Sequence, residues 1–451
     1  MRHDTTVAAR LAHRVTGLRF DDLPAEVVEH TKLLILDQIG VQVLGTTLPN
    51  MQPIRRAAAA VPGPGQSTVT GGGLTDAAQA AYVNGALGHS CEYDDAHAAA
   101  WHTSSTVVTA ALALAEREGV DGREVITAVA AGVQVMGVLG AVTTGGMVAA
   151  GWHGSKVLGV FGAAAAAGRI LGLSPAELTE AFGIAGSDAS GTMEYDRSGG
   201  EVKRLHAGSA ARAGVEAAQL ARLGLTGPAT IFEGHRGVFR LFAQAEGPVP
   251  EAAWDHWQIL DTIFRFYPMV GTVHAPLDAV RHLRETHAVD TTQIRRIRIG
   301  LVDFAVGHGA AITRPTDAIS AQFSLAFGVG LQFVTGGNAP ADYFDPARWN
   351  DPRILAVGDL VEPYAMPIPA GDPIFSARVD VELHDGTRLG HYQAGFRGHP
   401  TRPATRADIE EKFHTNVTAV LGTENAQAVM AAVAALDSLT DVAPLTRQLR
   451  R

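Results

Sequence analysis

The sequence has little cysteine, few aromatic side chains and few charges. Its 451 residues include one cysteine, 6% aromatic residues and 18% charged residues. A single cysteine, Cys91, excludes an intramolecular disulfide framework and any iron–sulfur or zinc site that needs four cysteines of one chain. This cysteine usage is typical of a reducing compartment, and we expect a cytoplasmic protein.

Basic charge is also scarce, because 36 Lys and Arg face 46 Asp and Glu for a net charge of −10. A nucleic-acid binder would present a basic face, and the short run Arg295, Arg296 and Arg298 is too isolated for one. The N-terminal residues contain no apolar signal segment, and the apolar stretch around Arg169 is short and interrupted by glycine. We therefore expect neither nucleic acid nor membrane as a partner.

Common cofactor and nucleophile motifs are missing. No G-x-x-x-x-G-K-[ST] or G-x-S-x-G occurs, and Gly71–Gly73 lack the strand–helix context of a dinucleotide fingerprint. The sequence thus predicts a site built from side chains alone, without a cofactor.

The pattern of apolar residues predicts a mainly α fold with two domains. Residues 1–261 and 395–451 read as an Ala-rich helical domain formed by both termini. Residues 262–394 read as an inserted α+β domain. In it, alternation around residues 297–301 and 379–383 predicts strands, and Asp385-Gly386 predicts a hairpin turn. Residues 319–334 and 351–364 read as helices.

Ligand-type side chains are densest in residues 85–105, "GALGHSCEYDDAHAAAWHTSS". This stretch holds three histidines and three carboxylates: His89, Glu92, Asp94, Asp95, His97 and His102. They could ligate a divalent metal, although the spacing matches no strong zinc signature. They could equally form a metal-free acid/base site, which we favour, or a solvated loop in which aspartates cap turns.

Three further stretches favour the acid/base interpretation. His153 lies among glycines before an Ala-rich helix, and "VKRLH" places Lys203 beside two more basic groups at another helix start. "FRFYPMVGTVH" adds Arg265, Tyr267 and His274 where the helical pattern gives way to the α+β pattern. Taken singly, these could be a buried structural histidine or an exposed basic turn. Together, imidazoles and cations suit proton transfer next to a carboxylate.

Five blocks of the sequence resemble the MmgE/PrpD family, which includes 2-methylcitrate dehydratase, cis-aconitate decarboxylase and iminodisuccinate epimerase. They are "VNGALGHSCEYDDAH", "GWHGSKVLGVFGAAAAAGRILGLS", "VKRLHAGSAARAGVEAAQLARLGLTGPATIFEG", "FYPMVGTVHAPLDA" and "DAISAQFSLAFGVG". The resemblance implies a helical domain with an inserted α+β lid domain, a homodimer, and a cofactor-free site in the cleft between the domains. It also implies site residues in the acidic loop, at His102, His153 and Lys203, and between Arg265 and His274.

The chain departs from the decarboxylase-like pattern at five positions. Glu92 replaces an aspartate, and the other four positions are Ala96, Arg265, Val270 and Leu325, where threonine, lysine, histidine and tyrosine would stand. These changes disfavour a strict cis-aconitate decarboxylase. Arginine can bind a carboxylate in a bidentate way but is a poor proton donor or acceptor.

The sequence therefore predicts a cofactor-independent lyase of dehydratase type that acts on a small di- or tricarboxylate. We expect His102, His153 and Lys203 to be catalytic and no metal to be bound. We expect five residues to bind substrate: Glu92, Asp94, Arg265, Tyr267 and His274. An epimerase or isomerase with the same proton chemistry, and an inactive relative that only binds a ligand, remain open alternatives.

Overall fold

The structure is a computed structural model that describes residues 6–60, 63–195 and 199–450. The chain divides into two units. Unit 1 comprises Met1–Ser90, Asp94–Thr262 and Thr405–Arg451, and unit 2 comprises Cys91–Tyr93 and Ile263–Ala404.

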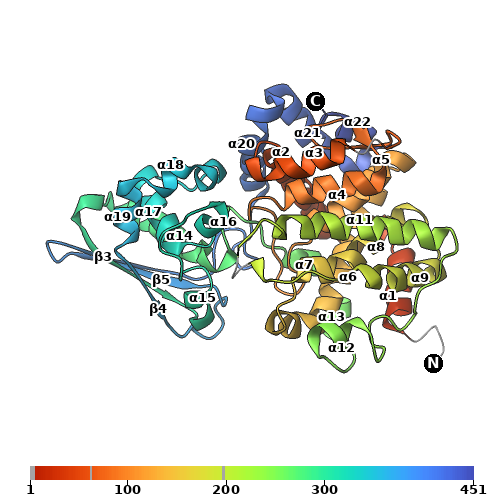
Figure 1. Cartoon of the computed structure of the whole chain (residues 1–451), viewed down its shortest axis with the longest axis horizontal. Helices are drawn as coiled ribbons and strands as arrows, with labels where there is room; N and C mark the ends of the chain where they lie inside the picture. Colours follow the sequence, from red (N-terminus) through yellow and green to blue (C-terminus); the bar gives the residue numbers. More distant parts are fainter. Residues whose placement is uncertain (1–5, 61–62, 196–198, 451) are drawn as a thin grey trace. The chain divides into compact units, whose positions relative to one another are not determined.

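Unit 1 consists almost wholly of helices. Those of eight residues or more are α1 (Val7–Gly17), α2 (Ala25–Gly45), α3 (Gln52–Ala59), α4 (Ala77–Gly88), α5 (Ser104–Glu118), α6 (Gly122–Ala149), α8 (Gly159–Ile170), α9 (Pro175–Ala185), α11 (Lys203–Arg222), α20 (Arg406–Leu421) and α21 (Thr423–Ala434). The shorter ones are α7 (Gly154–Val157), α12 (Val238–Ala243), α13 (Glu251–Asp255) and α22 (Ala443–Arg447). The strands β1 (Ser67–Thr68) and β2 (Leu74–Thr75) form a minimal antiparallel pair. Helix α20 packs against α2, so both ends of the chain build this unit (Figure 1).

Small residues let the helices of unit 1 approach closely. Helix α11 packs against α4, α5, α8 and α9. Where α11 meets α4, a Cβ on Gly208 would lie 2.1 Å from the carbonyl oxygen of Tyr82, and a Cβ on Gly85 would lie 2.7 Å from the Cα of Gly208. No other residue fits at either position without moving backbone, so these glycines set the distance between α4 and α11.

Helix α6 is long and apolar enough to cross a membrane by length and composition alone. However, 83% of its most apolar window is buried inside the protein. It packs against α8, α12 and α5, which is the environment of a core helix.

Unit 2 contains a four-stranded sheet with the order β4-β3-β5-β6. The strands are β3 (Ile294–Leu301), β4 (Val361–Ala365), β5 (Ala377–Leu383) and β6 (Arg388–Gln393). The sheet is mixed, because β3 is parallel to β4 but antiparallel to β5. The predicted hairpin between β5 and β6 is confirmed, and Gly386 adopts the left-handed φ of 88° that its turn requires.

Helices cover the sheet of unit 2 (Figure 1). Helix α14 (His274–His287) packs on β5 and β6, and α17 (Leu325–Thr335) packs on α14 and on α19 (Pro352–Gly358). The remaining helices are α15 (Asp303–Gly307), α16 (Ala318–Gln322) and α18 (Pro346–Trp349). A mainly α fold with an α+β part is therefore confirmed.

Two details of the predicted organisation differ. The helix expected over residues 351–364 ends at Gly358, and Val361–Ala365 form β4 instead. Pro363 is tolerated there because β4 is an edge strand. Unit 1 resumes at Thr405 rather than at residue 395, since Gly398 and Arg397 hydrogen-bond to Phe264 and Asp278 within unit 2.

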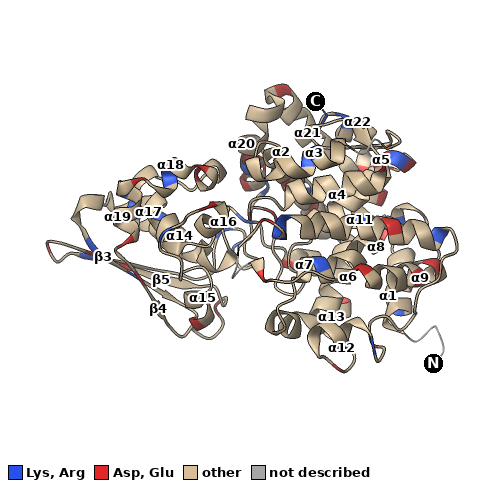
Figure 2. Ribbon diagram, in the orientation of Figure 1, with Lys and Arg blue, Asp and Glu red and all other residues tan. Residues whose placement is uncertain are grey.

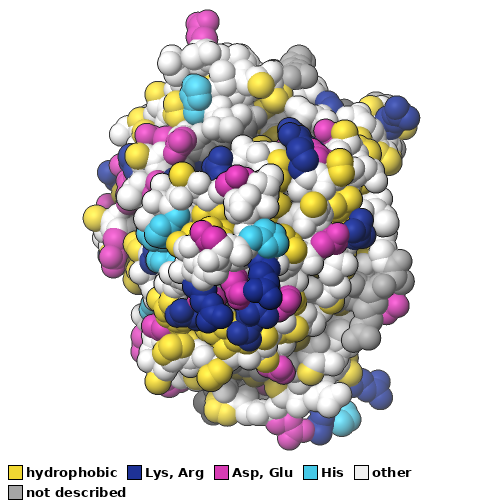
Figure 3. Space-filling model, turned by 90° about the vertical axis from the view of Figure 1, so that its left-hand side faces the viewer, with side chains coloured by type: hydrophobic (Ala, Val, Ile, Leu, Met, Phe, Trp, Pro, Cys, Tyr) yellow, Lys and Arg dark blue, Asp and Glu magenta, His cyan; other side chains and the backbone are white. Residues whose placement is uncertain are grey.

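Charged side chains lie mainly at helix ends, loops and the sheet, and the interior helices of unit 1 carry few (Figure 2). On the sheet of unit 2, Glu382 accepts ion pairs from Arg295 and Arg296 at 3.1 Å and from Arg388 at 3.8 Å. In Figure 3 several Lys and Arg side chains group together, with Asp and Glu side chains beside them. Two arginines of the basic run thus lie on unit 2 paired with a carboxylate.

Candidate active site

Asp95 organises the loop that joins α4 to α5. Its carboxylate oxygens accept hydrogen bonds from the backbone N–H and the hydroxyl of both Thr103 and Ser104, at 2.5 to 2.9 Å. Burial, together with the neighbouring carboxylate of Asp94, raises the pKa of Asp95. Asp95 caps the start of α5 from within the loop, so its role is to hold the loop in place.

Asp94 holds two imidazoles of unit 1. One carboxylate oxygen lies 2.7 Å from Nδ1 of His89 and also accepts from the hydroxyl of Ser105, at 2.7 Å. The other oxygen lies 3.7 Å from Nδ1 of His102. Nδ1 of His102 lies 2.7 Å from the backbone carbonyl oxygen of Asp95. Adjacent aspartates therefore hold both rings in place, and direct binding of substrate by Asp94 stays a prediction.

His153 supplies a third imidazole from a different part of unit 1. It precedes α7 and is fully buried. Its Nδ1 lies 3.0 Å from Nδ1 of His206, in the first turn of α11. The indole of Trp101 meets its ring edge-on, with centroids 5.3 Å apart. A helix N-terminus, an aromatic wall and a second imidazole thus define the position of His153.

The three rings gather around one point. The centroid of His89 lies 4.7 Å from that of His102 and 5.7 Å from that of His153, and the rings of His102 and His153 lie 6.1 Å apart. One ring nitrogen of each histidine lies within 4.8 Å of one from each of the others. Nε2 of His89 and Nε2 of His153 are buried and have no hydrogen-bond partner among the described residues. Such atoms are expected to serve a ligand or a proton.

Burial keeps part of this cluster neutral. The pKa of His153 lies well below its usual value, first because the ring is buried and then because Lys203 and the other histidines repel a positive charge. Burial likewise lowers the pKa of His206 to about 3. At neutral pH both rings are therefore proton acceptors rather than cations.

Two buried lysines belong to the same region of unit 1. Lys203 begins α11, and its ammonium lies 5.9 Å from the centre of the Tyr195 ring. Lys156 lies in α7, one turn after His153, and burial lowers its pKa to about 8. Both can supply the positive charge that a substrate carboxylate or a developing enolate needs.

Unit 2 contains the other candidate residues. The guanidinium of Arg265 forms an ion pair with Glu92 at 2.9 Å, and each side chain is only 2% exposed. Glu92 has a left-handed backbone with φ of 54°, which is costly for a residue with a Cβ. Glu92 and Arg265 both depart from the decarboxylase-like pattern. The structure shows that they are partners in one ion pair.

Tyr267 and His274 are bonded within unit 2. The hydroxyl of Tyr267 donates to Asp278 at 2.8 Å, and burial raises the pKa of Tyr267 well above its usual value. Nε2 of His274 lies 3.1 Å from the carbonyl oxygen of Met269. These contacts stabilise unit 2, and a direct role of either residue in substrate binding stays a prediction.

Within unit 1 the structure brings His102 and His153 together and places Lys203 at the start of the helix that carries His206. The sequence analysis did not select His89, His206 or Lys156 as site residues. His89 lies five residues before Asp94. This short spacing was the one sign in the sequence that the two side chains contact each other. His97 differs, because Nε2 binds the carbonyl of Gln258 and Nδ1 accepts from two backbone N–H groups.

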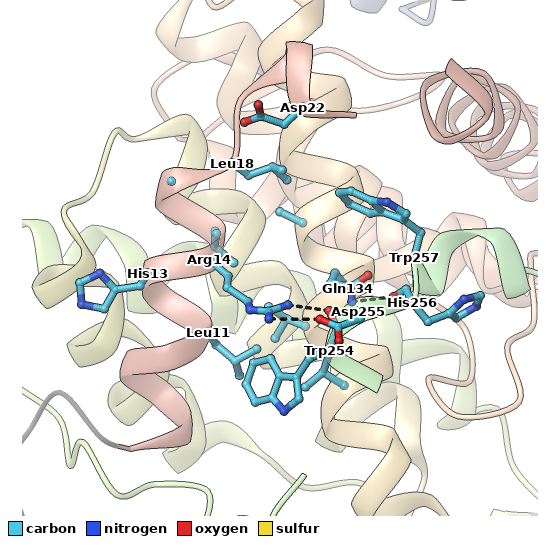
Figure 4. A pocket seen from close by; sticks show the side chains of 15 residues that line it. Leu11, His13, Arg14, Leu18, Asp22, Gln134, Trp254, Asp255, His256 and Trp257 are labelled. Atoms are coloured by element: carbon cyan, nitrogen blue, oxygen red, sulfur yellow. Dashed lines mark hydrogen bonds and ion pairs between the residues drawn. The ribbon is translucent and has the colours of Figure 1, made fainter. Parts of the chain in front are cut away.

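A cavity of about 440 Å³ lies elsewhere in unit 1 (Figure 4). It is bordered by α1, by α6 and by the segment that follows α13, with Arg14, Trp254 and Trp257 among its lining. None of the predicted site residues lines this cavity. We therefore place the candidate active site at the histidine cluster and not in the cavity.

Comparison with known proteins identifies the family of the chain. Residues 9–251 match the MmgE/PrpD N-terminal domain and residues 267–438 match the MmgE/PrpD C-terminal domain. The chain belongs to the MmgE/PrpD family. It is 29% identical to the cis-aconitate decarboxylase-like protein oryM of Aspergillus oryzae, over 97% of this chain and 96% of that protein. It is 27% identical to the cis-aconitate decarboxylases of Homo sapiens and of Aspergillus terreus, over 99% and 98% of this chain and 95% and 96% of those proteins.

Proposed function

We propose that this protein is a lyase of dehydratase type for a small di- or tricarboxylate, in which His102 and His153 move protons at a carbon next to a carboxylate. The observation that carries the proposal is the gathering of three buried imidazoles, two of which are oriented by the carboxylate of Asp94 and the backbone carbonyl of Asp95. Membership of the MmgE/PrpD family and the similarity to decarboxylases support a lyase.

The arrangement suits elimination of water from a hydroxy acid. One imidazole takes the proton from the α-carbon, and the electrons of the C–H bond form the double bond. The hydroxyl leaves with a proton from the other imidazole, which enters this step in its protonated, imidazolium form. Nδ1 of His102 donates to the carbonyl of Asp95, so its Nε2 is the atom that exchanges a proton. Lys203 would stabilise negative charge that develops on the substrate carboxylate.

Dehydration is preferred over cis-aconitate decarboxylation because of the side chains that changed. Val270 and Leu325 are buried and apolar, whereas the decarboxylase-like pattern has histidine and tyrosine there. Ala96 likewise lacks a hydroxyl. A substrate with different polar contacts would account for all three. Epimerisation is the second candidate, because the rings of His102 and His153 are tilted by 36° with 6.1 Å between centroids, so they could serve two faces of one carbon.

The proposal is tested by incubating the protein in D2O with a panel of hydroxy- and unsaturated carboxylates, including citrate, 2-methylcitrate and cis-aconitate. Proton NMR separates the outcomes. A new alkene proton signal from a hydroxy acid that has lost its hydroxyl group supports dehydration. Release of CO2 would replace the proposal by decarboxylation, and α-deuteration without change of skeleton would replace it by epimerisation. No exchange and no turnover across the panel would overturn an enzymatic function and favour a ligand-binding relative.

A further inference from the structure

The three imidazoles of the cluster present the donor set of a transition-metal site. We propose that His89, His102 and His153 bind one divalent transition-metal ion such as Zn²⁺, and that the bound ion reversibly blocks the site.

Hydrogen bonds to Nδ1 of His89 and of His102 decide which ring nitrogen carries the hydrogen. The carboxylate of Asp94 accepts from Nδ1–H of His89 at 2.7 Å, and the same carboxylate also accepts from Ser105. The carbonyl of Asp95 can only accept, so Nδ1 of His102 carries a hydrogen. In the neutral rings, Nε2 of each histidine therefore holds the lone pair. Metal-binding histidines show this pattern, with the second ring nitrogen donating to a carboxylate or a backbone carbonyl.

His153 can take the same form. Its Nδ1 lies 3.0 Å from Nδ1 of His206, and one of the two rings must donate while the other accepts. When Nδ1 of His153 donates, its Nε2 becomes the ligand atom. That Nε2 is buried without a hydrogen-bond partner among the described residues, as is Nε2 of His89. In this form His206 accepts a hydrogen bond from Nδ1 of His153, as Asp94 accepts one from Nδ1 of His89.

The distances permit coordination after small ring movements. One nitrogen of each ring already lies within 4.8 Å of one from each of the others. Zn²⁺ binds imidazole nitrogen at about 2.0–2.1 Å in a tetrahedral arrangement, which needs the nitrogens to close by roughly 1–1.5 Å. Three histidines leave the fourth position open for water or an anion. His102, whose side chain is 10% exposed, is the ring of the three that solvent reaches.

Charge nearby is balanced rather than prohibitive. Lys203 and Lys156 oppose a cation, but the buried carboxylate of Asp94 lies directly behind His89 and 3.7 Å from Nδ1 of His102, and Asp95 is buried in the same loop. Imidazole donors suit Zn²⁺, Co²⁺, Ni²⁺ and Cu²⁺, and they suit Mg²⁺ and Ca²⁺ poorly. The site should therefore discriminate against the hard alkaline-earth cations.

The blocking role rests on the proposed function. A bound ion would occupy the ring nitrogens through which His102 and His153 exchange protons, so turnover should fall as the site fills. Binding of the ion does not depend on that function and is measured separately.

The test titrates the full-length, chelator-treated protein with Co²⁺ alone and follows its visible absorption. We expect one equivalent per chain with the bands of a tetrahedral nitrogen site, and displacement by Zn²⁺ but not by Mg²⁺. His89→Gln and His153→Gln should each lose the bands, and His206→Gln should weaken binding by roughly 10–100-fold. His256→Gln, on an exposed histidine of unit 1, should bind as the parent does.

Several results would overturn the proposal. Absence of Co²⁺ bands in the parent protein, or equal binding by the His89→Gln and His153→Gln variants with a retained far-UV circular dichroism spectrum, would remove the metal site. Unchanged turnover at full Zn²⁺ occupancy, or turnover that requires the ion and stops on chelation, would remove the blocking role while the proposed lyase activity is judged from its products.

Discussion

The buried polar groups of the two units are used differently. In unit 1, His89 and His153 are held by Asp94 and His206, and each keeps a ring nitrogen without a partner among the described residues. In unit 2, the candidate side chains are bonded to their own unit, as Arg265 is to Glu92 and Tyr267 to Asp278. The difference supports the proposal that unit 1 transfers protons, whereas these polar groups of unit 2 stabilise the fold.

The largest effect is expected from the histidines of unit 1. Replacing His153 or His102 by glutamine keeps the ring volume approximately but removes the proton acceptor, so turnover should fall at least ~100-fold. His256→Gln should leave turnover unchanged, because this exposed side chain pairs only with Asp261. Steady-state kinetics on the substrate identified by NMR provide the measurement. Near-normal turnover of the His153 variant would remove that residue from the mechanism.

The next effect concerns the buried ion pair of unit 2. Glu92→Gln removes the charge that pairs with the buried guanidinium of Arg265 at 2.9 Å, which should destabilise the fold by about 3–5 kcal/mol. The double variant Glu92→Gln/Arg265→Met removes both charges and should recover most of that loss. Urea unfolding followed by circular dichroism measures both variants. If the single and double variants were equally unstable, the ion pair would not be the cause.

Close glycine contacts allow a matched comparison between the units. Gly208→Ala places a Cβ against the backbone of α4 in unit 1, and Gly330→Ala places one 2.3 Å from the carbonyl of Ile354 in unit 2. Each should cost about 1–3 kcal/mol of stability. Only Gly208→Ala should also lower turnover, because α11 carries His206. Gly145→Ala in α6, where no atom lies within 4 Å, should be neutral or slightly stabilising and is the control.

The smallest effect is a dependence of stability on pH that originates in unit 1. Burial lowers the pKa of His30 to about 4 and also lowers the pKa of His97. As the pH falls, the unfolded chain takes up these protons near pH 6.5, before the folded chain does. The contribution of these two neutral histidines to the free energy of unfolding is therefore fully present above that pH. It falls as the pH drops towards 4, by at most about 1.4 kcal/mol per pH unit for each group. His30→Gln should flatten the slope in urea midpoints between pH 6.5 and 4. An unchanged slope would assign the acid sensitivity elsewhere.

Local signals in the sequence predicted most of the fold. The alternation of β3 and β5 and the turn at Asp385-Gly386 act over a few residues, and the structure confirms them. Strand β4 was missed because its pairing with β3 is parallel and distant in sequence, so its five residues resemble the end of the preceding helix.

The site was predicted less completely, for the same physical reason. His102 and His153 stood out because each lies among small residues at a helix start. The contact of His206 with His153 depends on tertiary packing, which leaves no local pattern in the sequence. Helix α11 brings His206 to His153, and Gly85 and Gly208 allow α11 to touch α4. The ion pair of Glu92 with Arg265 joins residues 173 positions apart and leaves no local pattern.

The central claim is that the histidine cluster of unit 1 performs the proton transfer. It is tested most directly by deuterium incorporation at the substrate α-carbon, measured at saturating substrate for His153→Gln and His256→Gln side by side. The account predicts that the His153 variant loses exchange while the His256 variant exchanges as the parent does. Retained exchange in the His153 variant would contradict the account.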